Sequence, residues 1–206
     1  MNLRVNKKKF VYLISPNKIY KKFFKDLQKV LETGKISFFQ LRFKKYSFKH
    51  KILIGKKIKN ICKKNKVKFL INDDPILAKR LGADGCHLGQ KDMNIKDARK
   101  IIGKKIIGIT CHNSITLAKI AIKAKASYLA FGAFYSSKTK KTIHLAHIKI
   151  LNKIKKITKT PIVAIGGINS KNYKKLLLNN ANFLAISGYI WNNKKYKPLE
   201  ALERLK

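Results

Sequence analysis

The chain has 206 residues, which is enough for one domain with a full hydrophobic core, and its hydrophobic share of 45% is ordinary for a soluble globular protein. No apolar run is long enough for a membrane span, the first residues lack the apolar region of a signal peptide, and 3 cysteines are too few for a disulfide framework or a zinc knuckle. We therefore expect a single cytoplasmic domain over residues 1–206, with no membrane partner.

Basic residues outnumber acidic ones by 49 to 9, which gives a formal net charge of +40. Such a charge is typical of nucleic-acid-binding proteins. However, the lysines are spread along the whole chain on the polar faces of helical segments, and no nucleic-acid-binding motif accompanies them. A compositional bias towards Lys, Ile and Asn explains this distribution better, so we expect anionic substrates and no specific nucleic-acid partner. A noncatalytic nucleic-acid-binding protein is the alternative from a different functional class.

Short apolar runs alternate with segments of helical periodicity along the chain. Strands are predicted at residues 10–14, 36–41, 68–71, 85–88, 106–110, 128–131, 162–165 and 183–186. Helical segments include residues 19–31, 52–62, 115–122, 148–157 and 173–178, and a last short helix is predicted at 199–205. Most of the strands are apolar throughout, as parallel strands buried on both faces are. The pattern predicts an α/β fold, a single (β/α)8 TIM barrel, with a doubly wound open sheet as the alternative.

Carboxylates, which are scarce in this chain, end two consecutive strands. Asn72, Asp73 and Asp74 follow the third predicted strand, and Asp92 follows the fourth. The carboxyl ends of parallel strands meet at one edge of a barrel, where ligands bind. Asp74 suits the capping of the helix that follows, which leaves Asp73 and Asp92 as predicted ligands of Mg²⁺. For His87, which lies between these acids in the sequence, we expect a hydrogen-bonded core histidine.

Cations and hydroxyls follow two other predicted strands. The second strand runs into residues 40–44 (QLRFK), where alternation points Gln40, Arg42 and Lys44 to the same side. The loop after the sixth strand, residues 132–140, offers hydroxyls, backbone N–H groups and an ammonium. Both segments suit a phosphate or diphosphate, and the alternative for each is a plain solvated segment of a very basic chain.

Small residues end the last two predicted strands. Gly166 and Gly167 follow the seventh strand, and Ser187 and Gly188 follow the eighth. In barrels, the loops after these two strands commonly bind a phosphate, and glycine lets the backbone approach it closely. Together the two pairs indicate a phosphate site at this end of the barrel.

Taken in order, these motifs resemble the thiamine-phosphate synthase family over nearly the whole chain. The family motif Gln-Leu-Arg-Glu-Lys matches residues 40–44, Asn-Asp matches 72–73, His-x-Gly-Gln-x-Asp matches 87–92, Gly-x-Ser matches 108–110, the phosphate loop matches 131–140, and Ala-Ile-Gly-Gly-Ile matches 164–168. The chain departs from the family at Phe43, where Glu is usual, at Thr110, where Ser is usual, and at Gly188, where Ser is usual.

The resemblance implies a (β/α)8 TIM barrel of the phosphate-binding type. It also implies a transferase of thiamine biosynthesis that joins a pyrimidine methyl diphosphate to a thiazole phosphate and releases diphosphate. It implies that Asp73 and Asp92 hold Mg²⁺ on the diphosphate. The residues implied to hold the pyrimidine substrate and its diphosphate are Gln40, Arg42, Lys44, Asn72, Thr110 and Lys140, with Arg42 and Lys140 as the catalytic cations. Those implied to hold the thiazole phosphate are Ser137, Thr139, Gly167, Ser187 and Gly188, while Leu41, Phe43 and Lys138 complete the predicted substrate-binding residues.

Two other enzymes of similar fold compete with this interpretation. The related thiazole tautomerase would use proton transfer, for which His112 could serve as the base, and would not need the metal and diphosphate residues that this chain retains. Another phosphate-handling barrel enzyme, such as one from tryptophan or histidine biosynthesis, would leave the acid pair Asp73 and Asp92 unexplained. Whether the chain forms a homo-oligomer stays open at this point.

Overall fold

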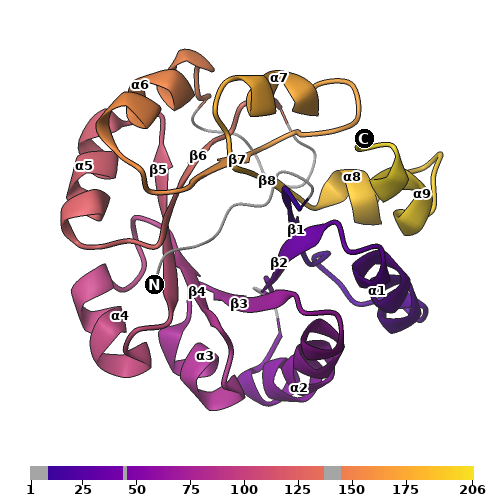
Figure 1. The fold of residues 1–206 in the computed structure, drawn as a ribbon. Helices are drawn as coiled ribbons and strands as arrows, with labels where there is room; N and C mark the ends of the chain where they lie inside the picture. The colour runs from indigo at the N-terminus through magenta and orange to yellow at the C-terminus, as the bar shows by residue number, and fades with distance from the viewer. Residues whose placement is uncertain (1–8, 44–45, 137–144) are drawn as a thin grey trace.

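The strands of this chain are apolar on both faces because they form the wall of a closed barrel (Figure 1). The computed structural model describes residues 9–43, 46–136 and 145–206. The strands are β1 (Val11–Ile14), β2 (Ile36–Leu41), β3 (Lys68–Asn72), β4 (Gly85–Leu88), β5 (Ile106–His112), β6 (Tyr128–Gly132), β7 (Ile162–Ile165) and β8 (Phe183–Ile186). They pair in parallel in sequence order, and β8 returns to pair with β1. The predicted (β/α)8 barrel is confirmed, and the open sheet is excluded.

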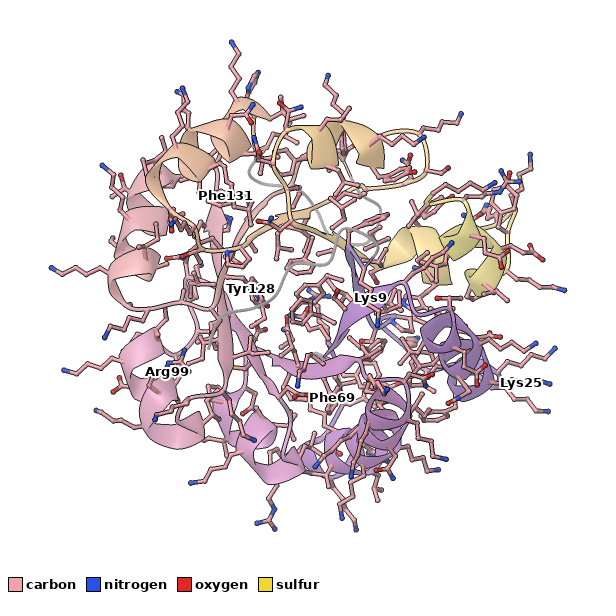
Figure 2. All side chains as sticks on the ribbon, viewed as in Figure 1. Lys9, Lys25, Phe69, Arg99, Tyr128 and Phe131 are labelled. Atoms are coloured by element: carbon pink, nitrogen blue, oxygen red, sulfur yellow. The ribbon has the colours of Figure 1, made fainter. Side chains whose placement is uncertain are left out.

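Helices surround the barrel (Figure 1). They are α1 (Phe23–Glu32), α2 (Phe48–Lys64), α3 (Pro75–Leu81), α4 (Ile95–Ile102), α5 (Ile115–Lys123), α6 (Lys149–Ile157), α7 (Tyr173–Leu178), α8 (Gly188–Trp191) and α9 (Pro198–Glu203). None of these described helices combines the length and the apolar character that a membrane span requires. Figure 2 shows long side chains, such as that of Lys25, radiating from the outer rim.

Local signals explain where several elements begin and end. Helix α2 begins at Phe48, before the predicted start, because the Ser47 hydroxyl caps it by accepting the N–H of His50 at 3.4 Å. Strand β5 continues beyond its predicted end to His112 through a shift in its register with β6 that follows Thr110. Capping and strand pairing thus determine where these elements begin and end, and hydrophobic periodicity does not predict either of them.

Alternation along each strand divides the apolar residues into two cores. Val11 and Leu13 of β1 belong to the core between strands and helices, whereas Tyr12 and Ile14 point into the barrel. The residues that fill the barrel interior are Tyr12, Ile14, Phe38, Leu70, Ile106, Tyr128, Ala130, Val163, Phe183 and Ala185. Side chains therefore close the barrel as a packed core, and ligands can reach only its rim.

The aromatic rings inside the barrel pack against one another. The ring centroids of Phe38 and Phe183 are 5.0 Å apart, and those of Tyr12 and Phe38 are 5.3 Å apart. Tyr128 lies inside the ring of strands in Figure 2, and it pairs in register with Gly108 of β5. A Cβ atom at Gly108 would overlap the Tyr128 ring. Glycine is therefore required at this position for a close approach between two strands.

The three cysteines are buried and carry free thiols, in agreement with the prediction that they are small apolar residues of the core. Burial raises the pKa of the Cys86 and Cys111 thiols to about 12. Neither thiol is therefore ionised at neutral pH.

We predict that Gly108→Ala lowers the free energy of unfolding by about 1–3 kcal/mol, which is the usual cost of overpacking a core. Urea denaturation measures this difference. Gly55→Ala in α2 is the matched comparison, because its new Cβ would lie 2.5 Å from the Cδ1 atom of Leu81, the end of a buried aliphatic side chain and not an aromatic ring. Alanine favours the helix by up to about 1 kcal/mol, so we expect a smaller loss of stability than for Gly108→Ala. If Gly108→Ala were as stable as the wild type, the result would contradict the packing of Tyr128 against β5.

Candidate active site

Two carboxylates are held at the ends of neighbouring strands. Asp73 follows β3, and its N–H donates to the carbonyl oxygen of His87 in β4 at 2.7 Å. Asp92 lies in the loop after β4, where its Oδ2 atom accepts the N–H of Gly89 at 2.6 Å. Asp74 is used differently, because its Oδ1 atom caps α3 by accepting the N–H of Leu77 at 2.8 Å. The predicted division of the acids between helix capping and the rim of the barrel therefore agrees with the backbone around them.

The donor chemistry of Asp73 and Asp92 fits Mg²⁺. Both residues offer hard carboxylate oxygens, and no cluster of three or more His, Cys, Asp or Glu occurs within residues 9–43, 46–136 and 145–206. A protein site with two carboxylates suits a cation that keeps water molecules and takes substrate phosphate oxygens as further ligands. Structural zinc, in contrast, would need four protein ligands of nitrogen or sulfur type.

A pocket of about 490 Å³ opens beside this acidic edge. Its polar lining includes Asn72 and Asp73, and Lys51 adds a cation from α2. Phe43 and Met93 supply apolar surface. The pocket therefore combines oxygen donors, an amide and a hydrophobic wall, a combination that suits a flat polar ring carrying an anionic group.

Phe43 and Leu41 are part of the core although they lie within the basic motif of residues 40–44. Their exposed fractions are 5% and 2%, and the ring of Phe43 lies 4.8 Å from that of Tyr46. Their side chains therefore offer only apolar contacts. Phe43, where the family pattern has Glu, is held in place by packing.

Arg42 lies where three strand ends approach one another. Its N–H donates to the Ser15 hydroxyl at 2.9 Å, and its Nη1 donates to Oδ1 of Asn17 at 3.4 Å. The Ser187 hydroxyl donates to the carbonyl oxygen of Ser15 at 3.1 Å. These bonds connect the predicted cation after β2 to the predicted phosphate residue after β8 through the loop that follows β1.

The loops after β6 and β7 are joined by their backbones. The N–H of Phe134 donates to the carbonyl oxygen of Ile165 at 3.0 Å, and the N–H of Tyr135 donates to the carbonyl oxygen of Gly166 at 3.1 Å. Gly167 has a φ of 62°, and a Cβ there would overlap Tyr135 and Ser136. Glycine is therefore required here, both because the backbone is left-handed and because there is no space for a Cβ atom. The predicted residues Lys44, Ser137, Lys138, Thr139 and Lys140 lie outside the described residues.

A continuous chain of hydrogen bonds crosses the mouth of the barrel. Gln40 donates from Nε2 to the Tyr12 hydroxyl at 3.1 Å, and the hydroxyls of Tyr12 and Tyr128 are 2.8 Å apart. The Tyr128 hydroxyl lies 2.9 Å from Nδ1 of His87, whose Nε2 lies 2.9 Å from the Thr110 hydroxyl. Two predicted substrate residues, Gln40 and Thr110, are thus linked through three residues that were not predicted to belong to the site.

Burial sets the protonation states within this chain. Desolvation lowers the pKa of His87 to about 4, although the charge of Asp92 opposes the shift. Desolvation also raises the pKa of the phenols of Tyr12 and Tyr128 above its ordinary value. At neutral pH the chain therefore consists of neutral groups. The prediction that His87 is hydrogen-bonded is confirmed at both ring nitrogens, although the residue is only partly buried.

One signal in the sequence pointed to the two tyrosines. Each occupies an inward position of a strand whose other residues are apolar, and a buried phenol needs a hydrogen-bond partner. The sequence did not indicate which residue is the partner, because the two tyrosines lie 116 residues apart.

Comparisons with known proteins agree on one family. The family model described as thiamine monophosphate synthase matches residues 11–190. A thiamine-phosphate synthase of Pelagibacter ubique is 70% identical over 97% of both chains, and one of Erythrobacter litoralis is 38% identical over 93% of this chain and 92% of the relative. The solved structure of a thiamine phosphate pyrophosphorylase from Pyrococcus furiosus has a TM-score of 0.85 at 28% identity, covering 96% of this chain and 94% of that one.

Proposed function

The chain belongs to the thiamine-phosphate synthase family of transferases, and we propose that it joins a hydroxymethylpyrimidine diphosphate to a thiazole phosphate in a Mg²⁺-dependent reaction. The products are thiamine phosphate and diphosphate. The observation that carries this proposal is the 70% identity over 97% of both chains to a thiamine-phosphate synthase. The two substrates are small anions, which the strongly positive protein attracts. We further propose that the protein works in the cytoplasm.

The diphosphate of the pyrimidine substrate binds at the rim next to β2, β3 and β4. Asp73 and Asp92 would hold Mg²⁺ there, which supplies positive charge against the phosphate oxygens. Arg42 adds a guanidinium that can form two parallel hydrogen bonds to a phosphate group. Lys44 and Lys140, which lie outside the described residues, are proposed from the family resemblance to add two more cations.

The pyrimidine ring binds beside the diphosphate. Asn72 lines the pocket next to Asp73 and provides an amide for the ring. Gln40 and Thr110 approach from the hydrogen-bond chain on the other side. Leu41 and Phe43 contribute the apolar wall. Orientation by these groups restricts the ring to one pose before the reaction starts.

The thiazole phosphate binds at the ends of β7 and β8. Gly167 and Gly188 allow the backbone to approach the phosphate, and Ser187 adds a hydroxyl. Ser137, Lys138 and Thr139, which lie outside the described residues, are proposed to complete this half. The hydrogen bond between Ser187 and Ser15 joins it to Arg42, so that the two substrates meet across one loop.

The reaction needs charge neutralisation more than it needs a nucleophile from the protein. In the dissociative mechanism that the family resemblance implies, the bond from the pyrimidine methylene carbon to the diphosphate oxygen breaks first, and the electron pair leaves with the diphosphate. Arg42 and Lys140 stabilise the charge that develops on this leaving group. The thiazole nitrogen then attacks the pyrimidine cation. Juxtaposition of the two bound substrates makes this step effectively unimolecular.

The test is an assay of the purified protein with both substrates, with and without Mg²⁺. We expect thiamine phosphate and diphosphate in equal amounts, and only when the metal is present. A protein that isomerises the thiazole phosphate and forms no thiamine phosphate would instead be a tautomerase. Metal-independent synthesis would contradict the roles proposed for Asp73 and Asp92.

The two adjacent acids should respond differently to the same substitution. We predict that Asp73→Asn lowers kcat/KM about 100-fold, since losing a metal ligand removes roughly 3 kcal/mol of transition-state stabilisation. Asparagine keeps the size of the side chain and tolerates the left-handed backbone of this position, where φ is 64°. Asp74→Asn is the matched control, because asparagine also caps helices and should keep wild-type activity. Equal effects in the two variants would exclude the proposed division of roles.

Restoring the family residue at position 43 should not improve the enzyme. Phe43→Glu would place a carboxylate at a site with 5% exposure, and we expect the free energy of unfolding to fall by about 3 kcal/mol. Phe43→Leu keeps the apolar character and should cost about half as much. Urea denaturation and the KM for the pyrimidine diphosphate measure both effects. A lower KM in Phe43→Glu, with stability unchanged, would show that the residue acts on the substrate.

A further inference from the structure

Five side chains from five different strands form the hydrogen-bond chain across the barrel mouth. In order they are Gln40 of β2, Tyr12 of β1, Tyr128 of β6, His87 of β4 and Thr110 of β5. Gln40 and both tyrosines are at most 2% exposed, so water does not replace these contacts. The proposed reaction uses only Gln40 and Thr110, which end this hydrogen-bond chain. The three residues between them have no role in it yet.

The chain has a direction, because each member has few hydrogens to give. The Gln40 Nε2 atom can only donate, so the Tyr12 hydroxyl accepts from it. The hydroxyls of Tyr12 and Tyr128 are 2.8 Å apart and either could donate, but among the described contacts the single hydrogen of Tyr12 finds an acceptor only if Tyr12 donates to Tyr128. Tyr128 then accepts one bond, and its own hydrogen finds an acceptor only if it is donated to Nδ1 of His87, which lies 2.9 Å away.

The direction of the chain determines the tautomer of His87. Because Nδ1 accepts from Tyr128, the single hydrogen of the neutral imidazole must be on Nε2. This hydrogen is donated to the Thr110 hydroxyl oxygen at 2.9 Å. The Thr110 hydroxyl oxygen therefore accepts a hydrogen bond from His87. The hydroxyl hydrogen of Thr110 remains available for a different acceptor.

We propose that Tyr12, Tyr128 and His87 are positioning residues that make the Thr110 hydroxyl a hydrogen-bond donor to the pyrimidine diphosphate substrate. The inference rests on the proposed function, which puts Thr110 in contact with that substrate. The ring nitrogens and diphosphate oxygens of the substrate are acceptors, so a hydroxyl that faced them with its lone pairs would repel them. A donor fixed in advance by buried neighbours needs no reorganisation when the substrate binds.

Nuclear magnetic resonance of ¹⁵N-histidine-labelled protein at pH 8 tests the direction of the chain without any assay of activity. Comparison with the spectrum of His87→Gln assigns the His87 signals. We expect hydrogen on Nε2 and an unprotonated, accepting Nδ1. In Tyr128→Phe, which removes the donor to Nδ1, the preference for this tautomer should fall. A hydrogen on Nδ1 in the wild-type protein would overturn the proposal.

Kinetics tests what the chain does for the substrate. We expect Thr110→Val and Tyr128→Phe each to raise the KM for the pyrimidine diphosphate about 5- to 10-fold, which corresponds to one hydrogen bond. The KM for the thiazole phosphate should not change. The double variant should be no worse than about 10-fold, because both substitutions remove the same donor. Multiplied effects in the double variant, or an equal rise in both KM values, would overturn the proposal.

Tyr173→Phe is the matched control for loss of a buried phenol. Tyr173 is 1% exposed, and its hydroxyl donates to the carbonyl oxygen of Lys206, outside the hydrogen-bond chain. The Tyr173→Phe variant should have the KM values of the wild type. A rise in KM like that of Tyr128→Phe would show that loss of any buried phenol disturbs the fold, and it would overturn the proposal. Absence of thiamine phosphate from the wild-type assay would refute the proposed function, whereas the tautomer of His87 would still decide the direction of the chain.

Discussion

The hydrogen bond between the hydroxyls of Tyr12 and Tyr128 is the constraint on which the mouth of this barrel depends. Strands β1 and β6 do not pair, so this 2.8 Å contact connects two separate parts of the wall through the interior. The interior of the barrel around it is filled with aromatic and aliphatic side chains. Two phenols in an apolar interior must bond to each other or to a polar neighbour, because an unpaired buried group is costly. The polar chain that serves the substrate is therefore anchored in the core.

The same principle explains why the acids are arranged as they are. In a chain with 9 acids and 49 bases, a carboxylate on the surface would be surrounded by cations. Asp74 and Asp92 instead accept backbone N–H groups, which fixes the positions of their carboxylates. Asp73 is positioned by its own backbone, through the hydrogen bond to His87 and the left-handed conformation. Geometry set by the main chain does not vary with the conformation of long basic side chains nearby.

Features with a local cause were predictable from the sequence. The capping role of Asp74 followed from its place before a proline at the start of an apolar helical pattern, and the eight strands followed from their apolar runs. Contacts between distant segments were not predictable. The link from Ser15 to Ser187 spans 172 residues, and it exists only because β8 closes against β1. Phe43 illustrates the same limit, because comparison with the family motif suggested a lost functional group, whereas the barrel packs its ring against Tyr46.

Closure of the sheet has a further consequence for assembly. An open sheet exposes unpaired N–H and C=O groups on its edge strands, and other chains can add strands there. In the barrel described here each strand has a neighbour on both sides, so copies of the protein cannot associate by extending the sheet. The outer faces of the helices offer another surface for contact between copies, since the apolar residues Ile120 and Leu178 there are 60% and 84% exposed. Repulsion between equally charged copies would oppose that contact most strongly in dilute salt.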